Sequence, residues 1–302
     1  MPLLRFIARP DVLPSPPDAG RLALIDLAFA AGAAFETATR PFLDALGARL
    51  AVWVDHHDHP AWADLSADPR FLLVSKLKAR ACPQLIAPDL VARAQPVDHL
   101  WAHADFDGCV AAAKYLRAGV TPYAEADEDA RFADAPGKGF VCSTRGRRYV
   151  SALDQVRSSG TPEQYEAMLQ ELCDVLVAGT AEPASFAAKI DLLVAAQEEH
   201  RQRLNPLLAQ ATRPHPDILL LVQEGLSSPD KKFVLRELEE RARVAVIYES
   251  GWSTTATFDD ERLDLSSLPG LRGQRGYAFG QVAPDAFMGS LVATLGDAAG
   301  EQ

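Results

Sequence analysis

The sequence predicts an α/β protein: a doubly wound, mainly parallel sheet followed by a smaller C-terminal α/β domain, to which it is joined by helices. Three observations predict this class. Short apolar runs alternate with helical segments, acidic or imidazole side chains follow directly after several of these runs, and a proline-rich break lies at residues 212–217. Alternation of strand and helix is typical of parallel sheets covered by helices on both faces.

Four apolar runs in the first half are continuous rather than alternating, which is typical of strands buried on both faces. They lie at residues 21–27, 49–60, 71–77 and 98–108. The alanine-rich segment 28–48 and the segment 109–119 show helical spacing of their larger apolar residues. Residues 120–139 are acidic and rich in turn formers, so we expect them to be irregular.

Residues 161–210 show apolar side chains at three- and four-residue spacing and are expected to be mostly helical. Beyond the break at 212–217, two strands at 218–224 and 244–250 flank a helix, and 253–260 is expected to pair with the second. The tail 265–296 is expected to be a glycine-rich loop followed by a helix. The predicted domains are 1–160, a helical linker 161–212 and 213–302.

Length and charge limit the class of partner. The 302 residues are enough for two domains, and 41 acidic against 30 basic side chains give a formal charge of −11. Such a balance disfavours long duplex DNA, which needs clustered Lys and Arg. No apolar stretch is long enough to span a membrane, and the N-terminal residues lack the features of a signal peptide.

The four cysteines, Cys82, Cys109, Cys142 and Cys173, lie far apart and show no paired spacing. This excludes a zinc site of the CxxC type and fits reduced thiols better than a disulfide framework. We therefore expect a cytoplasmic protein.

Histidines and aspartates gather at the predicted strand ends. Five of the seven histidines lie between residues 56 and 103. The polar residues that follow the strands are Asp26, Asp55, His56, His57, His103, Asp105 and Asp107. In doubly wound sheets the carboxyl ends of the strands converge on one edge, where ligands bind. So many carboxylates together would repel one another unless cations were bound, and oxygen-rich sites with one or two imidazoles suit Mn²⁺ or Mg²⁺.

The segments VDHHDHP and HADFDGCVAAAKYL resemble the motifs of the DHH phosphoesterase superfamily, over most of residues 20–135. That superfamily includes RecJ-like single-strand exonucleases, nano-RNA and cyclic-dinucleotide phosphodiesterases, and manganese-dependent pyrophosphatases. In this chain the family's Asp-x-Asp-Gly motif is matched by His103, Asp105, Asp107 and Gly108. The strand-end aspartate is matched by Asp26, and the Asp-His-His triplet by Asp55, His56 and His57.

The resemblance implies two Mn²⁺ ions, with Mg²⁺ as the alternative, and a role for each matched residue. Asp26 is expected to bridge both ions. His103 and Asp105 are expected to bind one ion, and His56 and Asp107 the other. His57 is expected to donate to the scissile phosphate and Asp55 to orient a histidine, so these two are the predicted catalytic residues.

The order of the motifs differs from that of the family, because Asp-x-Asp-Gly follows Asp-His-His here instead of preceding it. A circular permutation would account for this order and keep the geometry of the strand ends. The resemblance also implies a further metal-binding aspartate, for which the sequence offers several candidates. We favour Asp134, with Asp127, Asp129 and Asp154 as rivals, and a solvated acidic loop is the alternative.

The C-terminal domain bears a weaker resemblance to the DHH-associated substrate domain, whose glycine-rich loop approaches the substrate. The candidate substrate-binding residues in this chain are Gly270, Arg272, Gly273, Arg275 and Gly276. Arginine offers paired donors to a phosphate, and glycine permits a close approach of the backbone. A solvated loop is again the alternative.

The predicted function is a metal-dependent phosphodiesterase, of 3′–5′ or 5′–3′ exonuclease type, that hydrolyses short single-stranded oligonucleotides or linear or cyclic dinucleotides through a hydroxide activated by two metals. One alternative is a degenerate member that binds nucleic acid without hydrolysis. The other is a phosphatase of small phosphorylated nucleotides. No membrane partner is expected, and family members often pair, so a homodimer is an open expectation.

Overall fold

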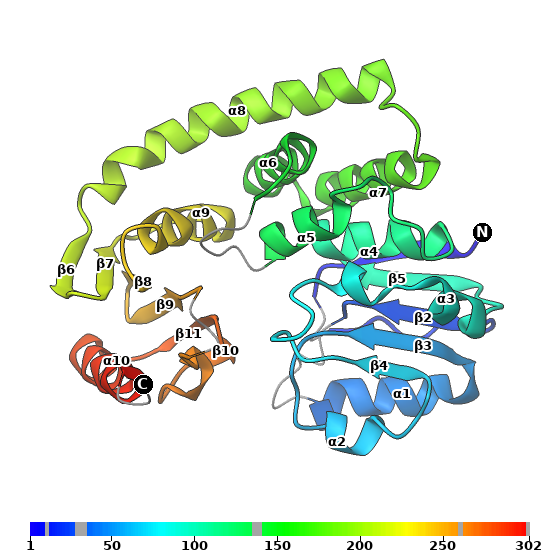
Figure 1. Cartoon of the computed structure of the whole chain (residues 1–302), viewed down its shortest axis with the longest axis horizontal. Helices are drawn as coiled ribbons and strands as arrows, with labels where there is room; N and C mark the ends of the chain where they lie inside the picture. The colour runs from blue at the N-terminus through cyan, green and yellow to red at the C-terminus, as the bar shows by residue number, and fades with distance from the viewer. Residues whose placement is uncertain (10–11, 28–34, 135–140, 259–261, 300–302) are drawn as a thin grey trace. The chain divides into compact units, whose positions relative to one another are not determined.

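The computed structural model describes residues 1–9, 12–27, 35–134, 141–258 and 262–299 (Figure 1). The chain divides into two compact units, each with a sheet of its own. The first contains Met1–Asp134, Val141–Val156 and Gly160–Asp191, and Leu192–Gln302 makes up most of the second. The α/β class, with a mainly parallel sheet and a second, smaller unit, is therefore confirmed.

The sheet of the first unit has five strands, all parallel, in the order β1-β5-β2-β3-β4. The strands are β1 (Leu3–Ile7), β2 (Leu22–Ile25), β3 (Leu50–Asp55), β4 (Phe71–Leu73) and β5 (His99–His103). Every residue of β2 and β3 is buried, as the continuous apolar runs predict.

Two details of this sheet correct the sequence prediction. The edge strand β1 was not predicted, because its sequence LLRFI carries a charge and begins with an exposed Leu3. The strand expected over 71–77 ends at Leu73, and the chain then turns, with the backbone N–H groups of Lys78 and Ala79 both donating to the carbonyl of Ser75.

The position of β5 brings distant parts of the chain together. Although β5 follows β4 in the sequence, it lies between β1 and β2, with Ala102 opposite both Phe6 and Ile25. The carboxyl end of β5 therefore lies beside the carboxyl end of β2, and that of β3 is next in line.

Helices cover both faces of the first sheet (Figure 1). They are α1 (Arg40–Leu46), α2 (Trp62–Leu65), α3 (Pro88–Ala94), α4 (Phe106–Leu116), α5 (Ala126–Asp134), α6 (Thr144–Ser159) and α7 (Pro162–Ala178). Phe42 and Leu46 of α1 pack on Leu24 and Trp53 on one face, and α4 packs along β5 and α7 on the other. The helical prediction for 28–48 holds from Phe35 onward, and residues 28–34 lie outside the described residues.

The expectation of an irregular segment at 120–139 is wrong in its centre, where α5 spans Ala126–Asp134. Its acidic composition resembles that of a solvated loop, but Ala126, Asp129, Ala130 and Ala133 form a buried face at helical spacing. Residues 135–140 lie outside the described residues.

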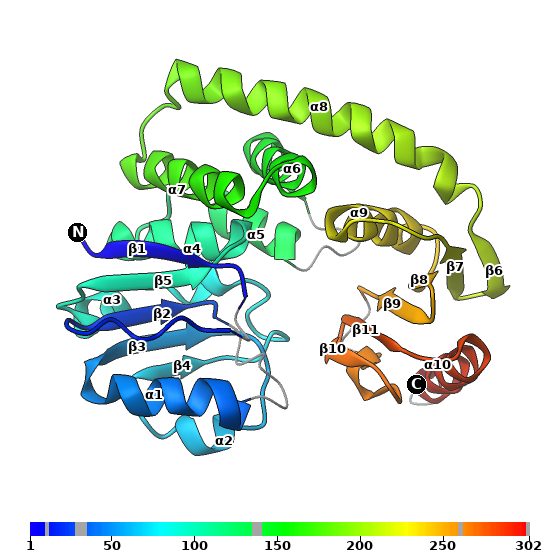
Figure 2. The same cartoon turned by 180° about the vertical axis from the view of Figure 1, so that it is seen from behind.

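The second unit has a six-stranded mixed sheet in the order β10-β11-β9-β8-β7-β6. Its strands are β6 (Thr212–His215), β7 (Ile218–Val222), β8 (Val244–Glu249), β9 (Trp252–Ala256), β10 (Arg272–Gln274) and β11 (Tyr277–Gln281). Among the described strands of this second sheet, only β7 and β8 are parallel neighbours. Helix α9 (Ser228–Glu239) packs on one face and α10 (Pro284–Ala299) on the other (Figure 2).

Two predictions for this unit need correction. The break expected at the proline-rich segment 212–217 is wrong, since β6 within it is the edge strand of the second sheet, where a proline is tolerated. The compact units divide instead within α8 (Ala184–Leu208), between Asp191 and Leu192. The tail expected to be a loop contains the hairpin β10–β11 before its helix.

Two further observations concern the chain as a whole. All four cysteines are buried free thiols. Within the described residues, the helices are too short or too polar to cross a membrane.

Candidate metal centre

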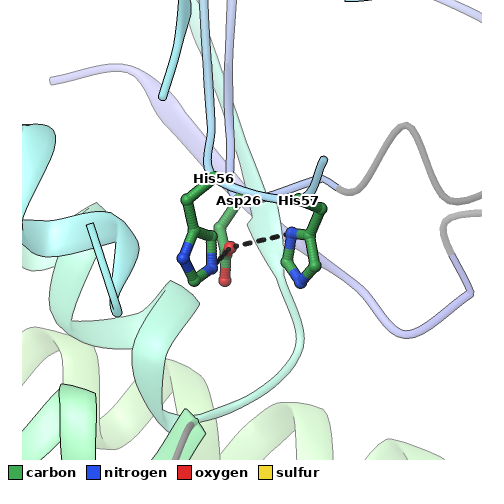
Figure 3. Close-up of side chains that lie close together, drawn as sticks. All are labelled: Asp26, His56 and His57. Carbon is green, nitrogen blue, oxygen red and sulfur yellow. Dashed lines mark ion pairs between the residues drawn. The ribbon is translucent and has the colours of Figure 1, made fainter. Parts of the chain in front are cut away.

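The polar residues predicted at the strand ends gather at the carboxyl edge of the first sheet. Asp26 follows β2 directly, His56 and His57 follow β3, and His103 is the last residue of β5. Figure 3 shows the imidazoles of His56 and His57 on either side of the Asp26 carboxylate. The side-by-side order of the three strands accounts for this convergence.

Asp26 lies at the middle of the cluster with only 1 % of its surface exposed. Its Oδ1 lies 3.1 Å from Nε2 of His56 and 3.7 Å from Nδ1 of His57, whereas its Oδ2 lies 3.9 Å from Nδ1 of His103. The backbone has a φ of 58°, and its N–H donates to the carbonyl of Val54. Aspartate tolerates this left-handed conformation better than most residues, and such strain is often found at functional sites.

His103 and Asp105 form a first group with Asp26. Oδ2 of Asp105 lies 3.1 Å from Nδ1 of His103, and its Oδ1 accepts the backbone N–H of Gly108 at the start of α4. A side chain at Gly108 would collide with the backbone of His103, its Cβ lying 2.3 Å from the carbonyl oxygen. Glycine therefore lets the first turn of α4 pack against the end of β5.

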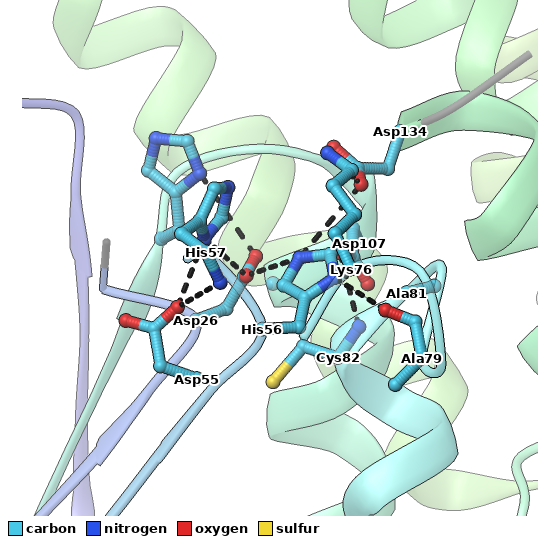
Figure 4. Close-up of polar contacts among 12 residues, drawn as sticks. Asp26, Asp55, His56, His57, Lys76, Ala79, Ala81, Cys82, Asp107 and Asp134 are labelled. Atoms are coloured by element: carbon cyan, nitrogen blue, oxygen red, sulfur yellow. Dashed lines mark hydrogen bonds and ion pairs between the residues drawn. The ribbon is translucent and has the colours of Figure 1, made fainter. Parts of the chain in front are cut away.

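His56, Asp107 and Asp134 form a second group (Figure 4). Nε2 of His56 lies 3.4 Å from Oδ2 of Asp107 and 3.7 Å from Oδ2 of Asp134. Nδ1 of His56 donates to the carbonyl of Ala79 at 2.9 Å. This bond fixes the hydrogen on Nδ1, so Nε2 of the neutral imidazole presents a lone pair to the carboxylates.

Asp55 contacts a histidine as predicted, and that histidine is His57. Its Oδ1 accepts the backbone N–H and the Nδ1–H of His57, both at 2.9 Å. Although burial opposes ionisation, these bonds to His57 hold the pKa of Asp55 below its ordinary value. Burial lowers the pKa of His57, while the carboxylate of Asp55 acts in the opposite direction.

The cluster carries more negative charge than its burial favours. Burial and the neighbouring carboxylates raise the pKa of both Asp26 and Asp107 well above the ordinary value. Within the described part of the chain, the buried atoms Oδ1 of Asp26, Oδ1 of Asp107 and Nε2 of His56 make no hydrogen bond of acceptable geometry. Oxygen and imidazole donors left in this way fit a divalent cation.

Among the residues that the structure describes, three sets of donor atoms are close enough to hold an ion, and they share members: Asp26 with His56 and His57, Asp26 with His103 and Asp105, and His56 with Asp107 and Asp134. Asp26 therefore belongs to two of the sets, and its two oxygens face different partners. This arrangement can hold two ions with a shared carboxylate.

Of the four aspartates considered for the further metal ligand, Asp134 is the one placed in this cluster. Oδ2 of Asp127 pairs with Nζ of Lys114 at 2.5 Å. Asp129 is fully buried and accepts the backbone N–H of Ser143 at 2.6 Å. Asp154 lies within α6 and does not belong to any of the three sets of metal-binding atoms named above.

Sequence reasoning missed three groups that contact the cluster from residues 76–82. Nζ of Lys76 lies 2.6 Å from Oδ2 of Asp134, the carbonyl of Ala79 accepts from His56, and the backbone N–H of Cys82 donates to Oδ2 of Asp107 at 3.2 Å. Burial opposes the charge on Lys76, but the carboxylate of Asp134 raises its pKa. The sequence pattern offered no signal for Lys76, because the expected strand 71–77 includes it; the observed strand ends at Leu73 and leaves Lys76 near the edge where ligands bind.

The predicted substrate-binding residues lie in the second unit, on the β10–β11 hairpin and beside it. Arg275 forms an ion pair with Asp264 at 3.1 Å, and the guanidinium of Arg272 lies over the rings of Trp252 and Phe279. Gly270 and Gly273 have positive φ values, and a Cβ at Gly273 would lie 2.4 Å from the carbonyl oxygen of Tyr277. Gly276 accepts the backbone N–H of Thr257 through its carbonyl. Their binding of a substrate stays a prediction.

Fold and cluster together define an α/β protein with a carboxylate–imidazole site suited to divalent metal ions. No protein-family model matches the chain, and no curated protein matches it. The chain is similar to an exonuclease RecJ bound to manganese, with 15% identity over 92% of this chain and 75% of that one, at a TM-score of 0.39.

It is also similar to RecJ in complex with Mn²⁺ from Thermus thermophilus, with 15% identity over 93% of this chain and a TM-score of 0.44, and it spans 45% of that protein. A third similar structure is the pGpG-specific phosphodiesterase PggH from Vibrio cholerae, with 11% identity over 93% of this chain and 99% of that one, at a TM-score of 0.44. The DHH phosphoesterase superfamily stays a resemblance that the motifs carry. The circular permutation stays a prediction, and at this similarity the chemistry depends on the residues of the site.

Proposed function

We propose that this protein is a metal-dependent phosphodiesterase that hydrolyses short single-stranded oligonucleotides or dinucleotides. The observation that carries the proposal is the position of Asp26, whose Oδ1 faces His56 while its Oδ2 faces His103. A carboxylate shared in this way between two ligand groups could hold two ions close together, as hydrolysis of phosphoesters by paired metals requires.

The ligands would divide into two positions. His103 and Asp105 would hold one ion, His56, Asp107 and Asp134 the other, and Asp26 would contribute an oxygen to each. Bound ions supply charge neutralisation at the phosphoryl oxygens and activation of water at neutral pH. Asp26 and Asp107, which are costly to ionise in the buried site, would become stable carboxylates with ions present.

His57 would act on the substrate rather than on the ions. Asp55 holds its Nδ1–H, so Nε2 is the atom left for the substrate. Its side chain is 21 % exposed, whereas that of His56 is fully buried. We assign it to the scissile phosphate, with Asp55 as the positioning residue. Donation from Nε2 to a phosphoryl oxygen would require the imidazolium form, which carries hydrogen on both nitrogens and which the Asp55 carboxylate favours.

The size of the substrate follows from the charge of the chain. With a net charge of −11, a broad basic channel for long nucleic acid is not expected, and bound ions would reverse the sign of charge only locally. A dinucleotide or a short single strand needs few phosphate contacts. We also propose that Arg272 and Arg275 bind the substrate directly.

Incubation with a substrate panel in the presence of Mn²⁺, with products separated by chromatography, tests the proposal. The panel contains linear dinucleotides including pGpG, short single-stranded RNA and DNA, a cyclic dinucleotide, a nucleoside bisphosphate and pyrophosphate. We expect mononucleotide release from the linear substrates, its loss in Asp105→Asn, and its retention in the control Asp127→Asn. Binding of oligonucleotide by all three proteins, with hydrolysis by none of them, would overturn the proposal in favour of a degenerate binding protein.

Release of phosphate from the bisphosphate, with the linear dinucleotides left intact, would instead identify a phosphatase of small nucleotides. The panel therefore separates the three functions that the motifs leave open.

A further inference from the structure

One short segment contacts every member of the second ligand group. Within Ser75–Cys82, Lys76 pairs with Asp134, Ala79 accepts from His56, and Cys82 donates to Asp107 (Figure 4). Two of these contacts come from the backbone and orient a ligand. The third brings a full positive charge into the place where a metal ion would bind.

Lys76 is built into the site rather than resting on its surface. It is only 7 % exposed, and its Nζ lies 2.6 Å from Oδ2 of Asp134. The turn at Ser75 fixes the backbone that carries it, since Lys78 and Ala79 both donate to the Ser75 carbonyl. Lys78, two residues later in the same turn, is exposed. A buried ammonium ion needs a compensating negative charge, which Asp134 supplies.

The charge of Lys76 is distributed unevenly over the two ligand groups. Of the carboxylates, that of Asp134 forms an ion pair with Nζ at 2.6 Å, and those of Asp107 and Asp26 act on the ammonium more weakly. The first two belong only to the group around His56, whereas Asp26 is shared. The group formed by Asp26, His103 and Asp105 is therefore the one less affected by this lysine.

We infer, on the basis of the metal centre proposed above, that Lys76 competes with the metal ion at the His56–Asp107–Asp134 position and makes it the weaker of the two. A divalent ion bound there repels the ammonium, so Nζ has to leave Oδ2 of Asp134 as the ion arrives. The two positions would then fill in order, first at Asp26–His103–Asp105 and then, at higher metal concentration, beside Lys76. In the metal-free protein the ammonium keeps Asp134 charged and in place.

Calorimetric titration with Mn²⁺, without substrate, tests this inference. For the unaltered protein we expect two classes of site whose affinities differ by tenfold or more. In Lys76→Met, which keeps the length of the side chain without its charge, the weaker class should tighten at least tenfold. Lys78→Met removes an exposed charge from the same turn and should titrate like the unaltered protein.

The opposite result is expected if Lys76 only holds Asp134 in position. Lys76→Met would then bind the second ion more weakly or not at all, and this outcome, or an unchanged affinity, would overturn the inference. Lys76→Arg keeps a charge and should leave the weaker class weak. If Lys76→Met does not fold, as judged by its circular dichroism spectrum, Lys76→Gln takes its place.

Failure of the inference and failure of the proposed function are distinguishable, because the titration contains no substrate. Two classes of Mn²⁺ site that converge in Lys76→Met would support the inference even if no nucleotide were hydrolysed. Hydrolysis with two equal sites in the unaltered protein would support the function and overturn the inference.

Discussion

Nε2 of His56 lies 3.1 Å from Oδ1 of Asp26, although 30 residues separate them in the sequence (Figure 3). The two residues follow adjacent parallel strands in which Ile25 lies opposite Val54, so both emerge at the same edge of the sheet. Nδ1 of His56 is engaged by Ala79, and Asp26 turns its other oxygen toward His103. This pair joins the two ligand groups.

Replacement of Asp107 by Asn should stabilise the metal-free protein at neutral pH. The folded-state pKa of Asp107 is raised above its unfolded value of about 3.9, so the folded state binds the proton more tightly. Its contribution to stability is therefore present below about pH 4 and is lost as the pH rises. In EDTA, we expect Asp107→Asn to melt above the unaltered protein at about pH 8, with a difference that narrows toward pH 4.

The same substitution should remove the part of the Mn²⁺ stabilisation that the ion beside His56 would supply and leave the part from the ion at Asp26, His103 and Asp105, which thermal melts with and without the metal will measure. Lower stability of Asp107→Asn in EDTA at neutral pH would show that the buried carboxylate does not destabilise the metal-free protein, which would contradict this prediction.

Asp55→Asn should reduce kcat/KM about 10–100-fold, because it weakens the bond that orients His57. Steady-state kinetics on a linear dinucleotide will measure this. Asp58→Asn alters an exposed carboxylate three residues away, whose partner is the hydroxyl of Ser75, and should change kcat/KM less than twofold. Equal losses in the two variants would argue against a positioning role for Asp55.

Asp134→Asn and Asp127→Asn separate a metal ligand from its neighbour on α5. The first carboxylate lies beside His56 and the second pairs with Lys114, so only the first should affect the ions. We expect Asp134→Asn to lose one of two Mn²⁺ equivalents, measured by metal analysis after gel filtration. Retention of both Mn²⁺ equivalents would show that the further metal-binding aspartate is a residue other than Asp134.

Asp129 should prove structural. It is fully buried and accepts hydrogen bonds from Ser143 N, Ser143 Oγ and Tyr123 Oη at 2.5–2.9 Å, and it thereby joins α5 to the start of α6. Asp129→Ala should lower the free energy of unfolding by about 2–5 kcal/mol, because it leaves these donors unpaired. Glu128→Gln, which alters an exposed ion pair, should cost less than about 1 kcal/mol in the same urea titration.

The strands that carry the site residues could be predicted from the sequence, whereas the edge strands β1 and β6 could not. The cores of β2, β3 and β5 are continuous apolar runs, and each is followed by the side chains that define the cluster. The strand β1 has an exposed edge residue and an arginine, and β6 contains Pro214, so neither shows a buried pattern. An edge strand pairs with one neighbour only, so its sequence need not be continuously apolar and can include a proline.

Lys76 shows what pattern reading cannot supply. Lys76 belongs to the site because of its tertiary contact with Asp134, which lies 58 residues later in the sequence. Asp134 is part of α5, a helix whose acidic composition led us to expect an irregular segment. The spacing of Ala126, Ala130 and Ala133 on that helix was a usable signal, but charged neighbours obscured it. Contacts between turns and helices of this kind depend on the completed fold.

A crystal structure of the protein grown with Mn²⁺ tests the central claim most directly, through the anomalous scattering of the metal. We expect two anomalous peaks about 3.5–4 Å apart, with an oxygen of Asp26 bound to each, His103 on one side and His56 on the other. A cluster without metal, or two ions that Asp26 does not bridge, would contradict the account.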